Sequence, residues 1–338
     1  MSEIAVAGGR AAWPGRAGES AGAAWAAPDS RRLLQLALGA AWLLDAVLQY
    51  QSFMFTKAFG QTIAATASGN PSAVAGPITW NARLVEQHSV ALNTAFATIQ
   101  LLLALGIAWR PTVRLALAAS IAWALGVWWF GEGLGGVLTG NASPVSGAPG
   151  AAVLYALLAV LLWPSDRGAG PAPFAAARAV GARAAQALWL LLWASLGYLA
   201  LQPGNRAPQA LHDMIAGMAD GEPGWLAAID RNSAALVAHQ GLATSTALVI
   251  VLALCAVGVY LPAPAARATL VLAIAVAAVI WVVGENLGAV FTGGGTDPNS
   301  GPLLALLALA YWPAGARPQG HLRWPLAGRP STGRTRGH

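Results

Sequence analysis

Charged residues are scarce in this sequence. Asp, Glu, Lys and Arg occupy 9% of its 338 positions, whereas they make up roughly a quarter of an average soluble domain. Hydrophobic residues reach 57%. So few charges argue against a soluble globular domain, and the composition predicts a protein of the lipid bilayer.

Cysteine and lysine are almost absent as well. The single cysteine, Cys255, excludes any disulfide bond within the chain. One of the 19 basic residues is a lysine, Lys57, and the others are arginines, which together with the many alanines is typical of a GC-rich bacterial genome. The basic residues are scattered and accompany no nucleic-acid-binding module, so no nucleic-acid partner is expected.

Long apolar runs are what the sequence does contain. They predict an all-α polytopic membrane protein with eight transmembrane helices, although the shortest runs fall below the ~20 residues that cross a ~30 Å hydrocarbon core. The runs are residues 33–50, 90–109, 113–130, 151–163, 187–201, 242–261, 268–283 and 303–312.

The placement of arginine predicts the orientation of these helices. Cytoplasmic loops accumulate Lys and Arg. With the N-terminus inside, the outer segments hold four of the 19 basic residues, Lys57, Arg83, Arg206 and Arg231, which leaves 15 on the inner side. We therefore expect a multi-pass protein of the bacterial plasma membrane with both termini cytoplasmic and an inner face suited to anionic lipid.

One pattern, GExLGxxxTG, occurs twice, at residues 131–140 and 284–293. His88 and His239 are 151 positions apart, as are Trp42 and Trp193, which indicates a duplicated four-helix unit. Because four is an even number, both copies must enter the membrane from the same side, as parallel repeats. The expected divisions are a disordered cytoplasmic arm (1–32), repeat 1 (33–164), a cytoplasmic linker (165–186), repeat 2 (187–313) and a disordered basic cytoplasmic tail (314–338). Each long outer loop is expected to carry one short amphipathic helix, at 53–65 and 210–219.

Glu132 and Glu285 follow the third and seventh predicted spans. Because the next spans are short, we expect residues 131–150 and 284–302 to dip below the outer surface, where non-helical backbone must be buried in protein or line a wet cavity. Two interpretations stay open, since each glutamate can cap a neighbouring helix end or line a polar cavity.

The glycines of the repeated pattern do not indicate a nucleotide site. Residues 131–136 match the dinucleotide fingerprint by letter, but no strand precedes them and the second copy departs from the motif. Both copies keep a GxxxG spacing that lets membrane helices approach closely. The favoured role is therefore helix packing, at Gly131, Gly135, Gly284 and Gly288.

Three further residues are candidates for a ligand or ion pathway. His88 and His239 stand at the outer starts of the second and sixth spans, where imidazole and carboxylate together could bind a transition metal or pass protons. An interfacial histidine is more often solvated, and no metal-ligand spacing accompanies these two, so the question of a metal stays open. Asp45 lies within the first span, where a charge is costly enough to indicate a functional or paired role.

Residues 36–42, running towards Gln49 and Phe53, and residues 103–106 before Arg110 resemble the four-helix DoxX/DoxD-type membrane unit. The whole chain resembles a group of eight-helix integral membrane proteins of actinobacteria, for which the GExLG stretch is typical and no activity is implied. DoxX/DoxD relatives include a small subunit of a thiosulfate:quinone oxidoreductase, so that resemblance implies a redox-associated membrane role. No catalytic motif of the family falls on residues of this chain.

The leading hypothesis is a non-enzymatic protein that binds or passes a small solute or ion. Its outer-side cavity between the repeats would be edged by Glu132, Glu285, His88 and His239, with Asp45 in the pathway. The alternative is a subunit of a membrane redox assembly, in which the same groups would face a quinone or a membrane-protein partner. A purely structural role also stays open, and the sequence carries no signal for a particular cofactor.

Overall fold

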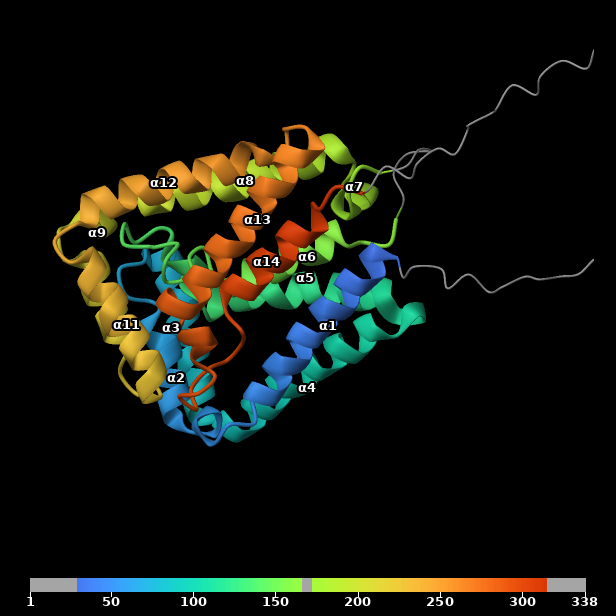
Figure 1. The fold of residues 1–338 in the computed structure, drawn as a ribbon. Coiled ribbons are helices and arrows are strands. Elements are labelled where there is room, and N and C mark those ends of the chain that lie inside the picture. The colour runs from blue at the N-terminus through green and yellow to red at the C-terminus, as the bar shows by residue number, and fades with distance from the viewer. Residues whose placement is uncertain (1–28, 166–171, 315–338) are drawn as a thin grey trace, which may run out of the picture.

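The computed structural model describes residues 29–165 and 172–314, and every regular element within them is a helix (Figure 1). The predicted all-α class is therefore confirmed for this part of the chain. Residues 1–28 of the predicted arm, 166–171 of the predicted linker and 315–338 of the predicted tail lie outside the described residues.

Fourteen α-helices make up the described part of the chain. The first half contains α1 (Ser30–Leu48), α2 (Lys57–Ala65), α3 (Ser72–Gln87), α4 (Ser89–Ala108), α5 (Val113–Phe130) and α6 (Ala151–Leu161). The second half contains α7 (Ala175–Val180), α8 (Ala182–Ala200), α9 (Pro203–Arg206), α10 (Ala210–Met218), α11 (Gly224–Val237), α12 (Gly241–Gly258), α13 (Ala263–Val279) and α14 (Ser300–Ala310).

Four of the helical segments are long and apolar enough to cross a membrane. They are Ser89–Ala108, Arg110–Phe130, Gly241–Gly258 and Ala263–Gly284, which correspond to the second, third, sixth and seventh predicted spans. Large apolar side chains such as Leu102, Leu115 and Ile250 are exposed on these helices. Exposed apolar surface of this kind suits contact with lipid, so the helices support a membrane location.

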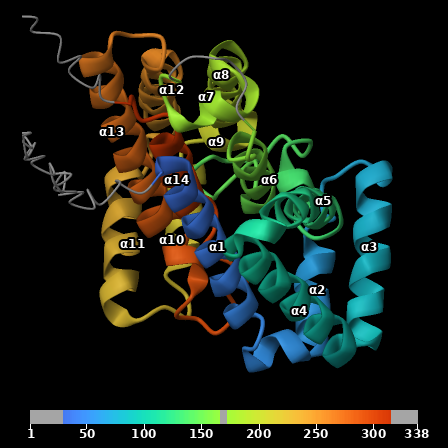
Figure 2. The same cartoon turned by 90° about the vertical axis from the view of Figure 1, so that its right-hand side faces the viewer.

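The two shortest apolar helices, α6 and α14, are central. Each has 11 residues, or about 16 Å of helix. Eight residues of α6 and seven of α14 are buried, and the two helices contact each other. Figures 1 and 2 place both between the longer helices. A helix that is apolar on every side suits such a buried place, and because α6 and α14 are enclosed by other helices, their length need not match the bilayer.

The same order of helix contacts occurs in both halves. In the first half α1 packs on α4, α4 on α5 and α5 on α6, while in the second half α8 packs on α12, α12 on α13 and α13 on α14. Figure 2 shows α8 and α12 at the top of the molecule and α4 near the bottom, with α1 between them. The α6–α14 contact joins the two halves.

Each of the two long loops predicted on the outer side contains more helix than the one segment expected: α2 and α3 in the first, and α10 and α11 with the short α9 in the second. The helices α2 and α10 fall on the expected segments, and they pack on α3 and α11 respectively. The sequence does contain a signal for α3, because Val74, Ile78, Ala82 and Val85 are buried at helical spacing. Polar residues between them make the segment too hydrophilic for a span, which is why the search for apolar runs missed it.

Both copies of GExLG make the same left-handed turn. The four residues of η3 (Gly133–Gly136) have φ between 58° and 67° at the glycines and 55° at Leu134. In η5 (Asn286–Ala289) the φ angles lie between 47° and 75°. Glycine adopts this region freely, whereas other L-residues pay roughly 1–2 kcal/mol each. The first copy has glycine at three of the four left-handed positions. The second copy has glycine only at Gly288, so its backbone is strained at Asn286, Leu287 and Ala289.

Gly136→Ala should lower the free energy of unfolding by about 1–2 kcal/mol. The added Cβ would meet no atom closer than 3.7 Å, so the loss would come from the backbone conformation alone. Ala289→Gly should raise the free energy of unfolding, by less, because glycine also frees the unfolded chain. Denaturant unfolding in detergent micelles measures both changes. Gly126→Ala, in α5 with open space around its Cβ, is the control, and a loss there equal to that at Gly136 would contradict the left-handed turn.

Candidate ligand-binding cavity

The two repeated glutamates cap the two central helices. One carboxylate oxygen of Glu132 accepts a hydrogen bond from the backbone N–H of Ala152 at 3.1 Å, in the first turn of α6. Glu285 accepts from the backbone N–H of Ser300 at 3.1 Å and of Gly301 at 2.9 Å, and from the Ser300 hydroxyl, at the start of α14. The capping interpretation therefore describes the contacts of both residues.

The glycines assigned to helix packing contact the backbone of loops and of their own helix. A Cβ at Gly135 would lie 1.9 Å from the Pro149 carbonyl oxygen, and one at Gly284 would lie 1.8 Å from the Val145 carbonyl oxygen. At Gly288 the nearest atom would be the Asp297 carbonyl oxygen at 2.7 Å, and at Gly131 it would be the Val127 carbonyl oxygen of α5 at 3.0 Å. These close contacts leave no room for a side chain where the loops before α6 and α14 pack. At Gly284 the contact is between the two halves, because Val145 belongs to the first half.

A cavity of about 450 Å³ lies next to Glu132. The ends of α1, α4, α5 and α6 that the sequence assigns to the outer side surround it, together with α2, Asn81 of α3 and two residues before α14, Thr296 and Asp297. Ligand pockets in proteins commonly have about 300–1,000 Å³. Thr62 and Ala122 line the cavity and are exposed, so it reaches the protein surface.

Three carboxyl groups line this cavity, and no Lys, Arg or His of the described chain lines it. Asp45 is 2% exposed and accepts a hydrogen bond of 2.8 Å from the Tyr155 hydroxyl. Asp297 accepts from the Thr296 hydroxyl at 2.7 Å and from the backbone N–H of Asn299 at 2.7 Å. With Glu132, these residues give the cavity a concentration of acidic groups.

Six aromatic side chains also line the cavity. The Trp42 and Tyr155 rings lie 4.2 Å apart, and those of Phe96 and Trp123 lie 5.6 Å apart, measured between centroids; Phe59 and Phe130 complete the set. Several buried polar atoms of the lining have no hydrogen-bond partner among the described residues: the side-chain oxygens of Gln49 and Gln100 and the indole nitrogen of Trp123. These atoms can bind a ligand.

Burial alters the acidity of the groups in the loops. It raises the pKa of Glu132 to about 8, with a further rise from the charge of Asp297, against the hydrogen bond from Ala152. Burial raises the pKa of Glu285 to about 7, while the hydrogen bonds from Ser300 and Gly301 oppose the rise. Burial also raises the pKa of Asp297. At neutral pH the Glu132 carboxyl group is therefore mostly protonated, and it loses its proton as the pH rises past about 8.

The structure brings together two of the five residues predicted for a ligand pathway. Asp45 and Glu132 line the cavity, whereas Glu285 is buried in its capping site. His88, between α3 and α4, is exposed, and His239 is exposed and bonded to Gln209. Neither histidine is among the lining residues of this cavity.

Sequence reasoning missed Asp297 and Tyr155. Asp297 belongs to the second half and enters a cavity built by the first, a placement that depends on how the halves pack. For Tyr155 a signal exists, because it is a hydroxyl-bearing residue in an otherwise wholly apolar run of 11 residues. A buried tyrosine usually finds a hydrogen-bond partner, and here the partner is Asp45.

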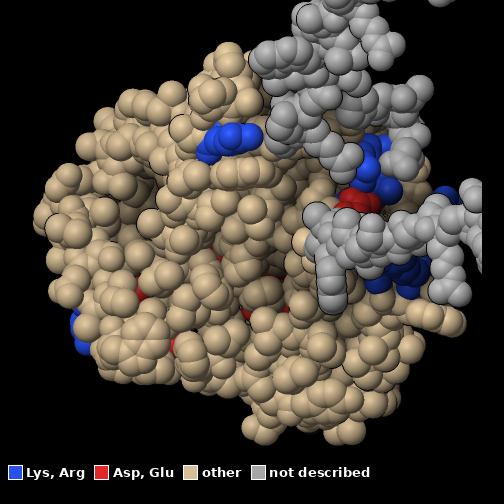
Figure 3. All heavy atoms as spheres, turned by 45° about the vertical axis from the view of Figure 1, so that its right-hand side comes forward, with Lys and Arg blue, Asp and Glu red and all other residues tan. Residues whose placement is uncertain are grey.

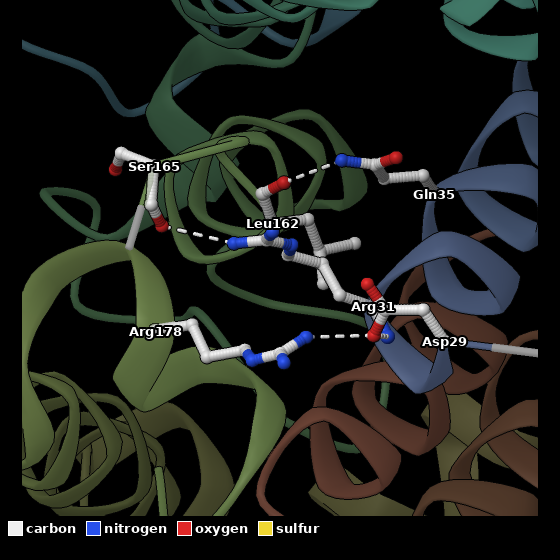
Figure 4. Close-up of polar contacts among 6 residues, drawn as sticks. All are labelled: Asp29, Arg31, Gln35, Leu162, Ser165 and Arg178. Atoms are coloured by element: carbon white, nitrogen blue, oxygen red, sulfur yellow. Dashed lines mark hydrogen bonds and ion pairs between the residues drawn. The ribbon is translucent and has the colours of Figure 1, made fainter. Parts of the chain in front are cut away.

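The opposite end of the bundle is rich in arginine. Figure 3 shows a surface dominated by uncharged side chains, with blue Lys and Arg gathered mainly beside the grey terminal segments. In Figure 4 Arg178 pairs with Asp29 at 2.7 Å, and Arg31 donates to the Ser165 carbonyl at 2.9 Å. Gln35 donates to the Leu162 carbonyl at 2.8 Å. These bonds tie the start of α1 to the end of α6 and to α7.

Within the described ranges, no group of three or more His, Cys, Asp and Glu side chains is arranged to hold a metal ion. Comparison of the chain with protein-family models, with curated proteins and with solved structures finds no match. Inference about function therefore starts from the cavity itself.

The wild-type protein should lose stability as the pH rises from 5 to 8. An exposed glutamic acid loses its proton near pH 4.5, whereas folded Glu132 holds it to about pH 8, so in this window the folded state binds more protons and the free energy of unfolding falls. Glu132→Gln should remove part of this slope, on the order of a few kcal/mol across the window. Thermal unfolding in detergent at each pH measures it, with exposed Asp213→Asn as control. A variant slope equal to that of the wild type would refute the role of Glu132.

Proposed function

We propose that this chain is a membrane-embedded binding protein for a small organic cation, which it takes up in the outer-side cavity beside Glu132. The observation that carries the proposal is the lining of that cavity, to which the described residues contribute three carboxyl groups, six aromatic rings and no basic side chain. Passage of the cation across the membrane would be an extension of the same role.

Charge and ring geometry both favour a cation. A carboxylate partly enclosed by protein attracts a cation more strongly than it does in bulk solvent. A cation against an aromatic face gains about 0.5–2 kcal/mol more. Asp45 and Tyr155 form one hydrogen-bonded pair in the lining of the cavity, and the Phe96 and Trp123 rings pack together in its wall. An ammonium group with an apolar substituent matches this combination.

The alternative is the quinone-linked redox subunit. A quinone carbonyl needs hydrogen-bond donors, and the indole N–H of Trp123 is one without a partner among the described residues. Two of the three carboxyl groups, Asp45 and Asp297, however, already accept hydrogen bonds from side-chain hydroxyls. Carboxyl oxygens that accept hydrogen bonds favour a ligand with N–H donors over a quinone, which has none. We therefore prefer the amine to the quinone.

The proposed setting is the bacterial plasma membrane, with eight crossings and two parallel four-helix repeats. The matching helix contacts of the two halves and the shared left-handed turn support the repeats. The arginine-rich end would face the cytoplasm, where exposed Arg110, Arg114 and Arg267 suit anionic lipid. The lipid-facing helices would also be the place for a membrane-protein partner.

Asp45→Asn should weaken the binding of an arylalkyl amine at least tenfold, a loss of about 1.4 kcal/mol. The variant keeps an acceptor for Tyr155 but removes the carboxyl group that can ionise beside a bound cation. Isothermal titration of the purified full chain with phenethylamine measures the affinity, and the neutral isostere 2-phenylethanol tests the need for charge.

The control for this titration is Asp213→Asn, an exposed acid of α10 outside the cavity, which should bind phenethylamine as the wild type does. Equal affinity for the amine and the alcohol, or an unaltered Asp45→Asn, would refute the cation. Preferential binding of a short-chain quinone would favour the redox alternative.

Cysteine labelling should place the α2–α3 turn outside and the α12–α13 turn inside. In a Cys255→Ser background, Ser68→Cys in the first turn should react with an impermeant maleimide on intact cells. Ala263→Cys at the start of α13 should react only after permeabilisation. Both positions are exposed in the fold, so their reactivity reports the side of the membrane. The reverse pattern would overturn the orientation.

A further inference from the structure

A group of buried oxygen atoms lies where the outer helix pair α10–α11 meets the second GExLG stretch. Glu222 in the turn before α11, Asp230 on α11 and Asn286 in η5 contribute them. Both carboxylate oxygens of each acid and the amide oxygen of Asn286 are buried and lack a hydrogen-bond partner among the described residues. Contacts of α10 and α11 with η4 (Ile280–Gly284), the π-helical end of α13, hold these elements together.

The unpaired acids are the unusual part of this arrangement. Asp230 is 0% exposed, and a buried ionised carboxylate without a partner costs several kcal/mol. The neighbouring Trp225, Ile229 and Arg231 are exposed and Glu222 is half-buried, so the group lies close to the surface. Within the described part of the chain, neither carboxylate accepts a hydrogen bond, although the positive charge of the adjacent Arg231 acts on Asp230 and lowers its pKa against the rise caused by burial.

The three residues are close enough to act together. The Asn286 amide nitrogen donates to the Met218 carbonyl, at the end of α10, which fixes the amide and leaves its oxygen available. Burial and then the charge of Asp230 raise the pKa of Glu222, while the Asn286 amide lowers it. Both Asp230 and Asn286 therefore lie near enough to Glu222 to alter its pKa.

We propose that Glu222, Asp230 and Asn286 bind a divalent cation of the calcium type. All the available ligand atoms are oxygens, and hard cations such as Ca²⁺ prefer carboxylate and amide oxygens, with carboxylates that bind through one or both atoms. Thiolate and imidazole ligands, which suit softer metals, do not take part. Two bidentate carboxylates and one amide would give five of the six to eight ligands that Ca²⁺ takes.

Such a cation would fasten the outer cap to the membrane-facing part of the second half. It would connect α11 to η5, whose next residues lead to the Glu285-capped start of α14. This site is separate from the cavity of the first half, since none of its three residues lines that cavity. The proposals of a calcium site and of an amine site can therefore be tested independently of each other.

Calcium at millimolar concentration should raise the thermal midpoint of the purified full chain by several degrees relative to EDTA, because a ligand that binds the folded state stabilises it. Glu222→Gln and Asp230→Asn should each lose that rise. Without calcium, Asp230→Asn should be at least as stable as the wild type, because it removes an unpaired buried charge. Asp220→Asn, an exposed acid two positions from Glu222, is the matched control and should respond as the wild type does.

A second measurement does not depend on the variants. Tb³⁺ luminescence sensitised by tryptophan should appear with the wild-type protein and be displaced by Ca²⁺. No thermal shift and no luminescence in the wild type would overturn the proposal, as would a full calcium response in both Glu222→Gln and Asp230→Asn. An equal response to Mg²⁺ would overturn the assignment to a cation of the calcium type.

Discussion

The structure depends on how the buried starts of α6 and α14 are satisfied. The first N–H groups of a helix lack partners within it, and those of two central helices that begin inside the protein have little access to water. Glu132 and Glu285 supply acceptors from 20 and 15 positions upstream. A carboxylate also favours the positive end of the helix dipole. The left-handed GExLG turn lets the chain pass each glutamate and return to its helix.

The two halves use this arrangement differently. Around Glu132 the first half leaves a cavity, with Asp45 and Gln100 in its lining. At the positions 151 residues later the chain has Leu196 and Val251, and Glu285 is 4% exposed. Apolar side chains at these positions need no water or ligand as a hydrogen-bond partner, so the second half can pack without a polar cavity. The first half thus carries the acidic and aromatic cavity, and the second carries the buried oxygen group between α11 and η5.

Much of the architecture could be predicted from the sequence because it depends on local patterns. Apolar runs indicated the helical class and the four long spans. The position of Asp45 within an apolar run indicated a functional or paired role, but not that Tyr155 would be its hydrogen-bond partner. The cavity could not be predicted, because Asp297 reaches it from the far half of the chain. The prediction that the two histidines edge the cavity was wrong for a related reason. Matching positions in the two repeats say nothing about which face of a helix a side chain occupies, and both His88 and His239 are exposed.

Glu132 belongs both to the cavity and to the cap of α6, so a ligand bound as proposed would be coupled to the fold. Its carboxyl group lines the cavity and accepts the Ala152 N–H of α6. A cation in the cavity would favour the ionised form, so binding would release the proton that folded Glu132 holds to about pH 8. The ionised carboxylate would in turn interact more strongly with the start of α6. Because α6 contacts α14, a change of charge at this one residue acts on the helix pair that joins the two halves.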